Sequence, residues 1–475
     1  MSRLTSVIRQ LSLGSLLTFA NSLRNPVFAR LYLAQTVSLL GDALTWVGLA
    51  LLAFELAGKD SALVLSAMLT LRVTAFVLLS PLAGALADRL DRKVILVTTH
   101  LFRMLIVGLL PLVTAIWQVY VLVFALNAFN AFFTPTYQAT LPLVVGEKDY
   151  PQALALSSAT YELLGVLGPG IAGGVAVLIG AREIFFLDAL SFLVAAILLF
   201  TLPGLPQIKS DEVDEQPGRT WRDIKEGTNR LFADAPMRYA LAMELVASIA
   251  GAQVLVNTVG YLKGGLHLGD VQYGWTMAAF GVGATLSALA VGAINRHLTH
   301  TSFIFIGALV GTLALIPASA VGLFSLMALW LMAGAGQNWV NLPTQALIAE
   351  RTPSAFQGRV YGAHFAWSHL WWALAYPVAG WLGSQFGGQS FVYGGLLGLI
   401  VLGIVQFTLA PQRPQQLVEH THEAIKHEHS HNELHDHEHP AGMAASQPHS
   451  HVHQHPGFQH IHEHTPGVAH RHGHY

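Results

Sequence analysis

The sequence contains no cysteine and little charge. Without thiols the chain forms no disulfide, zinc ribbon, iron–sulfur site or thiolate metal relay, so any metal chemistry must use His, carboxylates or amides. Only 11% of the 475 residues are charged, against about 25% in soluble domains. The formal net charge of −2 gives no basic surface for nucleic acid. No G-x-x-x-x-G-K-[ST] loop occurs, so the chain has no ATP motor of its own.

Long apolar runs dominate instead: 53% of residues are hydrophobic and the mean hydropathy is +0.49. Runs of about 20 such residues predict membrane-spanning helices. The predicted spans lie near 28–57, 62–87, 94–115, 118–139, 152–179, 183–203, 237–262, 271–293, 302–320, 322–347, 359–385 and 388–409. The expected fold is an all-α polytopic membrane protein, with twelve transmembrane helices in two six-helix, pseudo-symmetric halves.

The predicted organisation has five parts. They are a cytoplasmic lead-in (1–27), an N-terminal half (28–203), a central linker (204–236), a C-terminal half (237–410) and a tail (411–475). Twenty of the 25 Lys and Arg residues lie in segments that face the cytoplasm if both termini do, and only Lys59, Arg182 and Lys263 lie in outer loops. This bias predicts cytoplasmic termini. The two halves also echo each other, since Asn130-x4-Pro135 matches Asn338-x4-Pro343, as in a parallel repeat.

The loop after the second span reads Gly84-Ala-Leu-Ala-Asp88-Arg89-Leu-Asp-Arg92-Lys93. It resembles the G-x-x-x-D-R-x-x-R-K signature of the major facilitator superfamily. The resemblance implies a gating role for Gly84, Asp88, Arg89 and Arg92, in a charge network that latches the halves on the cytoplasmic side. The corresponding loop of the second half keeps only Gly292, Asn295 and Arg296.

The fifth span contains Gly168-Pro169 within a glycine-rich run. This run partly resembles the helix-bending motif of facilitator antiporters and exporters, which implies gating, while close helix packing is an equally open interpretation. The segment from Glu350 to Val360 resembles the branch that includes the enterobactin and macrolide exporters. The fourth span has Asn127 in place of the buried Arg of many drug–proton exporters of this superfamily.

The last 56 residues hold 18 of the 24 histidines, mostly in H-x-H order. Residues two apart in an extended chain point the same way, and imidazole binds nickel, zinc, copper and cobalt. The predicted metal ligands are His427, His429, His431, His435, His437, His439, His449, His451, His453, His455, His460, His462, His464, His470, His472 and His474. We expect this tail to be disordered without metal. Together with the facilitator body, it resembles the bacterial nickel-resistance exporters.

Ionisable and amide side chains inside spans usually face a cavity or a partner. The predicted substrate-binding residues are Asp42, Glu162, Glu244, Asn338, Asn341 and His364. Carboxylates would compensate a divalent cation, and amides or imidazole would supply neutral ligands, although structural packing stays open for each. His369 is five residues from His364, about 140° around a helix, so at most one of the two faces an ion. Arg72, Arg103, Asp188 and Glu55 are predicted to be structural.

The leading hypothesis is a secondary exporter, not an enzyme, that moves Ni²⁺, or Co²⁺ or Zn²⁺, out of the cytoplasm by proton antiport. It would act as a monomer in the bacterial inner membrane, with the metal ion and the lipid bilayer as its partners. It would use no nucleic acid, no ATP and no cofactor beyond the metal bound as substrate and by the tail. One alternative exports a siderophore, drug or metal chelate and uses the tail as a metal sensor. Another is a metal-storing or metal-sensing receptor that does not transport.

Overall fold

The computed structural model describes residues 23–87, 90–205, 219–294, 299–411, 417–422, 425–431, 449–455 and 458–463. The chain separates into two compact units, Met1–Ala410 and Pro411–Tyr475. Most of the predicted lead-in lies outside the described residues.

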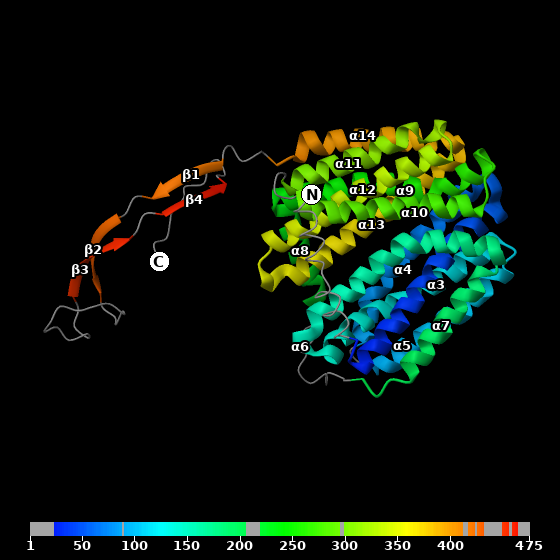
Figure 1. The fold of residues 1–475 in the computed structure, drawn as a ribbon, viewed down its shortest axis with the longest axis horizontal. Helices are drawn as coiled ribbons and strands as arrows, with labels where there is room; N and C mark the ends of the chain where they lie inside the picture. Colours follow the sequence, from blue (N-terminus) through cyan, green and yellow to red (C-terminus); the bar gives the residue numbers. More distant parts are fainter. Residues whose placement is uncertain are drawn as a thin grey trace, which may run out of the picture. The chain divides into compact units, whose positions relative to one another are not determined.

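The first unit is a bundle of helices (Figure 1). Its first half comprises α3 (Pro26–Ala57), α4 (Ser61–Ala87), α5 (Arg92–Leu109), α6 (Ile116–Ile179) and α7 (Ile184–Phe200). Its second half comprises α9 (Ala235–Gly260), α10 (Asp270–Ile294), α11 (His300–Leu315), α12 (Leu323–Arg351), α13 (Ser354–Phe386) and α14 (Ser390–Leu409), preceded by α8 (Arg219–Ala233). Gly146 (φ 77°, ψ 162°) interrupts α6 and divides it into two spans.

With α6 counted as two, the described residues contain six long helices on each side of the linker, which confirms the predicted fold. By length and composition, six described stretches could cross a membrane, or seven if the bent pair Leu167–Ile179 and Ile184–Phe200 is one span. Two of the six, Pro26–Leu79 and Arg359–Leu409, each contain two helices joined by a short 3₁₀ turn.

Local chemistry sets several helix ends. Asn25, Asp91 and Asp234 accept hydrogen bonds from first-turn N–H groups of α3, α5 and α9, which otherwise lack partners. Gly58 (φ 53°) and Gly387 (φ 54°) end α3 and α13 in conformations that disfavour other residues.

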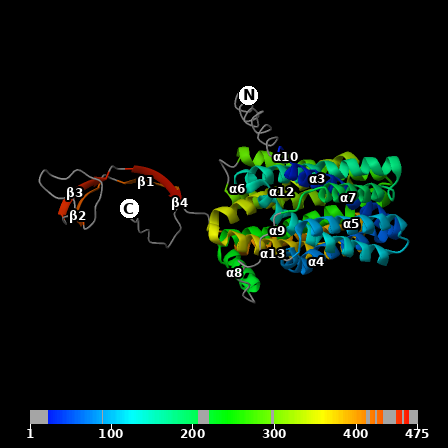
Figure 2. The same cartoon turned by 90° about the horizontal axis from the view of Figure 1, so that it is seen from below.

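Helix α8 was not predicted, because it is too polar to register as a span. It is amphipathic: Leu231 is fully buried beside Ile348 and Val360, whereas Lys225 is exposed. The helix lies beside α13 (Figure 2), and Glu226 pairs with Arg359 of α13 at 2.6 Å. The central linker therefore contains a helix that packs on the second half.

The halves meet at one end of the bundle, which we call the loop end because it carries the turn Gly58–Asp60 (Figure 1). The end that carries Pro26 and α8 is called the linker end. A Cβ atom on Gly173 of α6 would lie 2.6 Å from the Cα of Gly274 in α10, and one on Gly380 of α13 would lie 2.0 Å from Ser66 Oγ in α4. Small residues thus allow close packing of the halves at the loop end.

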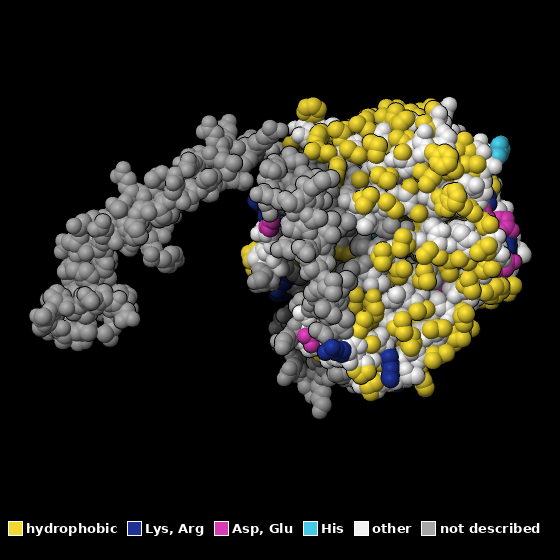
Figure 3. Space-filling view, viewed as in Figure 1, with side chains coloured by type: hydrophobic (Ala, Val, Ile, Leu, Met, Phe, Trp, Pro, Cys, Tyr) yellow, Lys and Arg dark blue, Asp and Glu magenta, His cyan; other side chains and the backbone are white. Residues whose placement is uncertain are grey.

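Hydrophobic side chains cover the flank of the bundle in Figure 3, and charged side chains lie mainly toward its ends. Exposed Phe324, Phe407 and Leu178 belong to this apolar surface. Such a belt is unusual for a soluble protein and fits a bundle surrounded by lipid.

In the second unit, β1 (Leu417–His422) pairs with β4 (Phe458–Glu463), and β2 (Ile425–His431) pairs with β3 (His449–His455), both antiparallel. The backbone of these four stretches is paired, and disorder of the tail without metal stays a prediction. The side chains of all sixteen predicted metal ligands lie outside what the structure describes.

Candidate functional site in the second half

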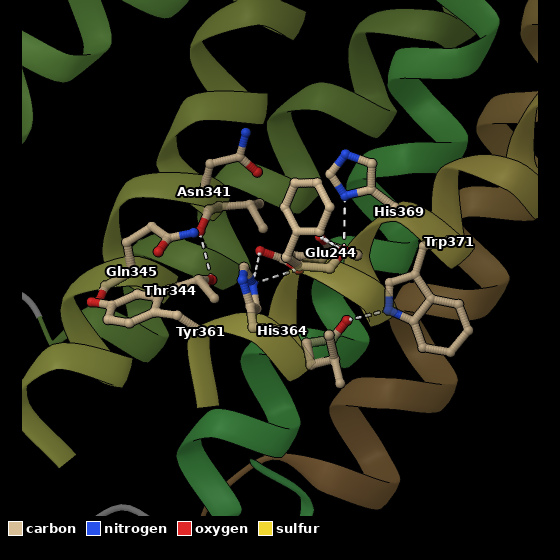
Figure 4. A network of polar contacts seen from close by, with 12 residues as sticks. Glu244, Asn341, Thr344, Gln345, Tyr361, His364, His369 and Trp371 are labelled. Carbon is tan, nitrogen blue, oxygen red and sulfur yellow. Dashed lines mark hydrogen bonds and ion pairs between the residues drawn. The ribbon is translucent and has the colours of Figure 1, made fainter. Parts of the chain in front are cut away.

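A buried carboxylate–imidazole pair lies in the second half of the bundle (Figure 4). His364 Nε2 on α13 is 2.9 Å and 3.0 Å from the two carboxylate oxygens of Glu244 on α9. The two side chains are only 6% and 8% exposed. Nearby, Trp371 Nε1 donates to Leu241 O at 3.0 Å and ties the same two helices together. Two of the predicted site residues, 120 positions apart, therefore form one buried hydrogen-bonded pair.

The predicted amides take different roles. Asn338 donates to Ala284 O of α10 at 2.6 Å, so it serves helix packing. Asn341 is exposed, and its Oδ1 accepts a long hydrogen bond of 3.4 Å from Gln337 Nε2. In Figure 4, Asn341 lies in the same region as Glu244 and His364. An amide with a weakly engaged oxygen is available to a ligand, whereas Asn338 is not.

His369 has a separate environment. Its Nδ1 is 2.8 Å from Phe365 O, and its ring lies 3.8 Å from the Phe365 ring. It makes no hydrogen bond to Glu244 in the described part of the chain; the oxygens of Glu244 face His364. The two histidines of α13 therefore have different partners, in keeping with their separation around the helix.

Asp42 lies in the first half and forms an ion pair. Arg103 Nη2 donates to its two oxygens at 2.8 Å and 3.0 Å, and the Arg103 side chain is 1% exposed. Asp188, fully buried beside them, accepts from Thr45 at 2.5 Å and from Ser191 at 2.9 Å. Both oxygens of Asp42 are thus engaged by a buried guanidinium, which fits the packing interpretation. Direct binding of substrate by Asp42 stays a prediction.

The residues predicted to be structural divide into two groups. Arg103 pairs with Asp42, and Glu55 pairs with Arg182 at 3.0 Å, as expected. Arg72 differs, because no carboxylate of the described residues lies within ion-pairing distance of it. Its guanidinium lies 4.5 Å from the centre of the Trp46 ring. That Arg72 is structural, as part of an ion pair or as a headgroup-level residue, stays a prediction.

His100 was missed by sequence reasoning. It is fully buried, neither ring nitrogen has a hydrogen-bond partner within the described part of the chain, and its ring packs edge-on against Phe133 at 4.6 Å. The available signal in the sequence was its position three residues before Arg103 on α5, which places both side chains on the same face of the helix. His100 is nevertheless a poor site for a metal ion, because the positive charge of the neighbouring Arg103 repels a second cation.

Only part of the predicted gating set is described. Arg92 is buried and donates to Ala139 O at 3.0 Å. Asp88 and Arg89 lie outside the described residues, and the burial of Gly84 is not described either. The charge latch between halves stays a prediction.

The Gly168-Pro169 run packs closely against other helices. A Cβ on Gly168 would lie 2.5 Å from Ala43 Cβ, and Pro169 O lies close to Gly274. Within α6, the residue with non-helical dihedral angles is Gly146 rather than Pro169. Packing is thus what this run does here, and bending at Pro169 stays a prediction.

The described residues contain no group of three or more His, Asp or Glu side chains that could hold a metal ion. Glu244 and His364 supply two ligands, and the Glu162 side chain lies outside what the structure describes. Transition-metal sites generally need about four donor atoms, and a water molecule bound to the metal can supply one of them. The pair is therefore at most part of a metal site.

A cavity of about 540 Å³ opens at the linker end between α4, α8 and α13. Its lining is mostly apolar and includes Val73, Val77, Thr228, Trp367 and Leu370. The halves are thus packed together at the loop end and separated by a cavity at the linker end.

Residues 31–258 and 241–429 match the sequence profile of a family described as the Major Facilitator Superfamily. The chain is 27% identical over 383 residues to the uncharacterised MFS-type transporter YfiS of Bacillus subtilis, covering 78% of this chain and 90% of that protein. It is 24% identical over 404 residues to the enterobactin exporter EntS of Citrobacter koseri, covering 81% and 92%.

Solved structures share the fold. A bacterial homologue of the human lysosomal transporter Spinster, inward-facing and occupied, superposes with a TM-score of 0.64 at 14% identity, covering 81% of this chain and 96% of that one. The nucleoside transporter NupG gives a TM-score of 0.64 at 12% identity, covering 81% and 100%.

Proposed function

The chain belongs to the major facilitator superfamily, and we propose that it is a proton-driven secondary exporter of the bacterial inner membrane. The observation on which this rests is the buried Glu244–His364 pair. A carboxylate and an imidazole that share hydrogen bonds can bind and release a proton as their surroundings change. An intramembrane pair of this kind is a common place for proton coupling.

The direction follows from orientation. The Lys and Arg bias puts the linker end in the cytoplasm, so the cavity there is the cytoplasmic entrance. The close packing near Gly173 and Gly380 then closes the outer side. In this inward-facing state, cargo enters from the cytoplasm. After the protein changes to its outward-facing state and releases the cargo, Glu244 binds a proton from outside and carries it back to the cytoplasmic side.

We propose a divalent transition-metal ion, nickel, as the first candidate cargo, because the histidine-rich tail offers imidazole ligands for such ions. Glu244, His364 and Asn341 offer oxygen and nitrogen donors of the kind such ions bind. Metal binding to carboxylate and imidazole displaces protons, which couples the two fluxes in opposite directions. The tail would collect or sense cytosolic metal.

The second candidate cargo is an organic compound, such as a siderophore, a drug or a metal chelate. Two observations favour it. The described residues offer two strong metal ligands rather than three, and a cation, Arg72, has no carboxylate partner among them. Relatives of 24% to 25% identity are named enterobactin exporters.

Inverted membrane vesicles test the exporter. Nickel entering the vesicles is measured by elemental analysis, and proton movement by a dye inside them, with and without an imposed pH gradient. The proposal expects nickel uptake that a gradient accelerates and that drives protons the other way. Vesicles from cells without the gene are the control. A rate of nickel uptake that does not change with the pH gradient would contradict proton coupling. Transport of organic compounds without transport of nickel would favour the second candidate.

A further inference from the structure

Arg72 differs from the other charged groups inside the bundle. Asp42 pairs with Arg103, Glu244 with His364, and Lys263 with Asp270. Within residues 23–87, 90–205, 219–294 and 299–411, no carboxylate pairs with Arg72. An unpaired guanidinium at the middle of a span is costly, so its retention indicates a function.

The position of Arg72 is between the two halves. It lies on α4, and its guanidinium covers the Trp46 ring of α3 at 4.5 Å. Its chain neighbours Val73 and Thr74 line the cavity together with Leu370 and Ala373 of α13, in the opposite half. It is only partly exposed. Residues of both halves therefore surround this cation, on the path that a cargo must take in alternating access.

The chemistry of such a site favours an anion. A guanidinium presents paired N–H donors that match a carboxylate or phenolate. Trp46 adds a flat aromatic face beside the guanidinium. On α13, the rings of Trp372 and Tyr376 lie 5.3 Å apart between centres, tilted by 38°. A bare divalent cation would be repelled by Arg72, since no carboxylate among the described side chains pairs with it.

We propose that Arg72 binds the anionic group of the cargo, and that the cargo is an organic anion with a carboxylate or phenolate, either free or as the ligand of a metal chelate. This inference rests on the proposed exporter and specifies its substrate class. It also accommodates the metal binding predicted for the tail beside a cationic Arg72, because a chelate carries metal while presenting negative charge.

The test uses the full chain in proteoliposomes with an imposed pH gradient. Four probes are compared: nickel chloride, citrate, nickel citrate and salicylate, each followed by elemental analysis or radiolabel. The expected result is transport of at least one of the three carboxylate-bearing probes and little transport of nickel chloride. Arg72→Gln should raise the half-saturating concentration of that probe about tenfold or more, because a charged hydrogen-bonded pair is lost.

Two variants keep the result interpretable. Arg72→Lys keeps the charge and should recover part of the affinity, and Lys59→Gln removes a charge from an exposed turn and should change nothing. Because no described carboxylate loses its partner when Arg72 is replaced, Arg72→Gln should fold, which size-exclusion chromatography checks. Transport of citrate without nickel would indicate that the cargo is a free anion. Transport of nickel citrate alone would indicate that the cargo is a metal chelate.

Two results would overturn the inference while leaving the exporter intact: gradient-driven transport of nickel chloride alone, or anion transport that Arg72→Gln leaves unchanged. A wild-type protein that moves none of the four probes would contradict both the inference and the proposed function. These outcomes separate the failure of the Arg72 site from the failure of the exporter.

Discussion

Replacing Glu244 or His364 separates a coupling role from a structural one. Glu244→Gln keeps the size and leaves an oxygen that can still accept from His364 Nε2, now 2.9 Å from the carboxylate. The loss is the difference between a charged and a neutral hydrogen bond, about 1 kcal/mol. His364→Leu leaves the carboxylate buried without its donor and should cost more, about 3 kcal/mol. Glu244→Gln should therefore fold and yet lose proton-coupled transport.

The measurement combines stability and flux. Thermal unfolding in one detergent gives the stability order: parent, then Glu244→Gln, then His364→Leu. The double variant Glu244→Gln/His364→Leu should be less destabilised than the sum of the singles, with a coupling energy of about 1–2 kcal/mol, because the two groups touch. Flux in vesicles should fall at least about 100-fold in Glu244→Gln and lose its dependence on the pH gradient. A Glu244→Gln protein that keeps wild-type flux and gradient dependence would refute the coupling role.

Other residues give further tests. Asp42→Asn should destabilise the fold by about 3 kcal/mol, because it strands the buried Arg103; it should reduce the folded yield, and an unchanged yield would contradict a structural pair. Gly173→Leu should block the approach of Gly274 at the loop end, reduce transport and weaken cross-linking between α6 and α10, whereas wild-type flux would argue against closure there. A tail peptide 419–475 should bind several nickel or zinc ions at pH 7.5 and far fewer at pH 5.5, since histidine protonates near pH 6.5. Equal calorimetric affinity at both values would exclude imidazole ligands.

Much of the fold followed from sequence because span length is a local property. A run of about 20 apolar residues must cross the membrane as a helix, whatever surrounds it. The predicted spans near 28–57 and 237–262 accordingly match α3 (Pro26–Ala57) and α9 (Ala235–Gly260) within a few residues. Helix α8 was missed because amphipathic, charged segments give no such signal, and their helicity depends on the surface on which they pack.

The site was decided by tertiary structure. In sequence, Asp42 and Glu244 are both single carboxylates in apolar spans, and Arg72 and Arg103 are both single guanidinium groups. The fold gives Asp42 a partner 61 positions away and Glu244 a partner 120 positions away, while Arg72 receives none among the described residues. Periodicity fixes which face of a helix a residue occupies, but the partner depends on how helices distant in sequence rotate and pack against that face. The sequence by itself determined a membrane bundle of this family with a histidine-rich tail. Only the packing of its helices decided which of the described charges have partners.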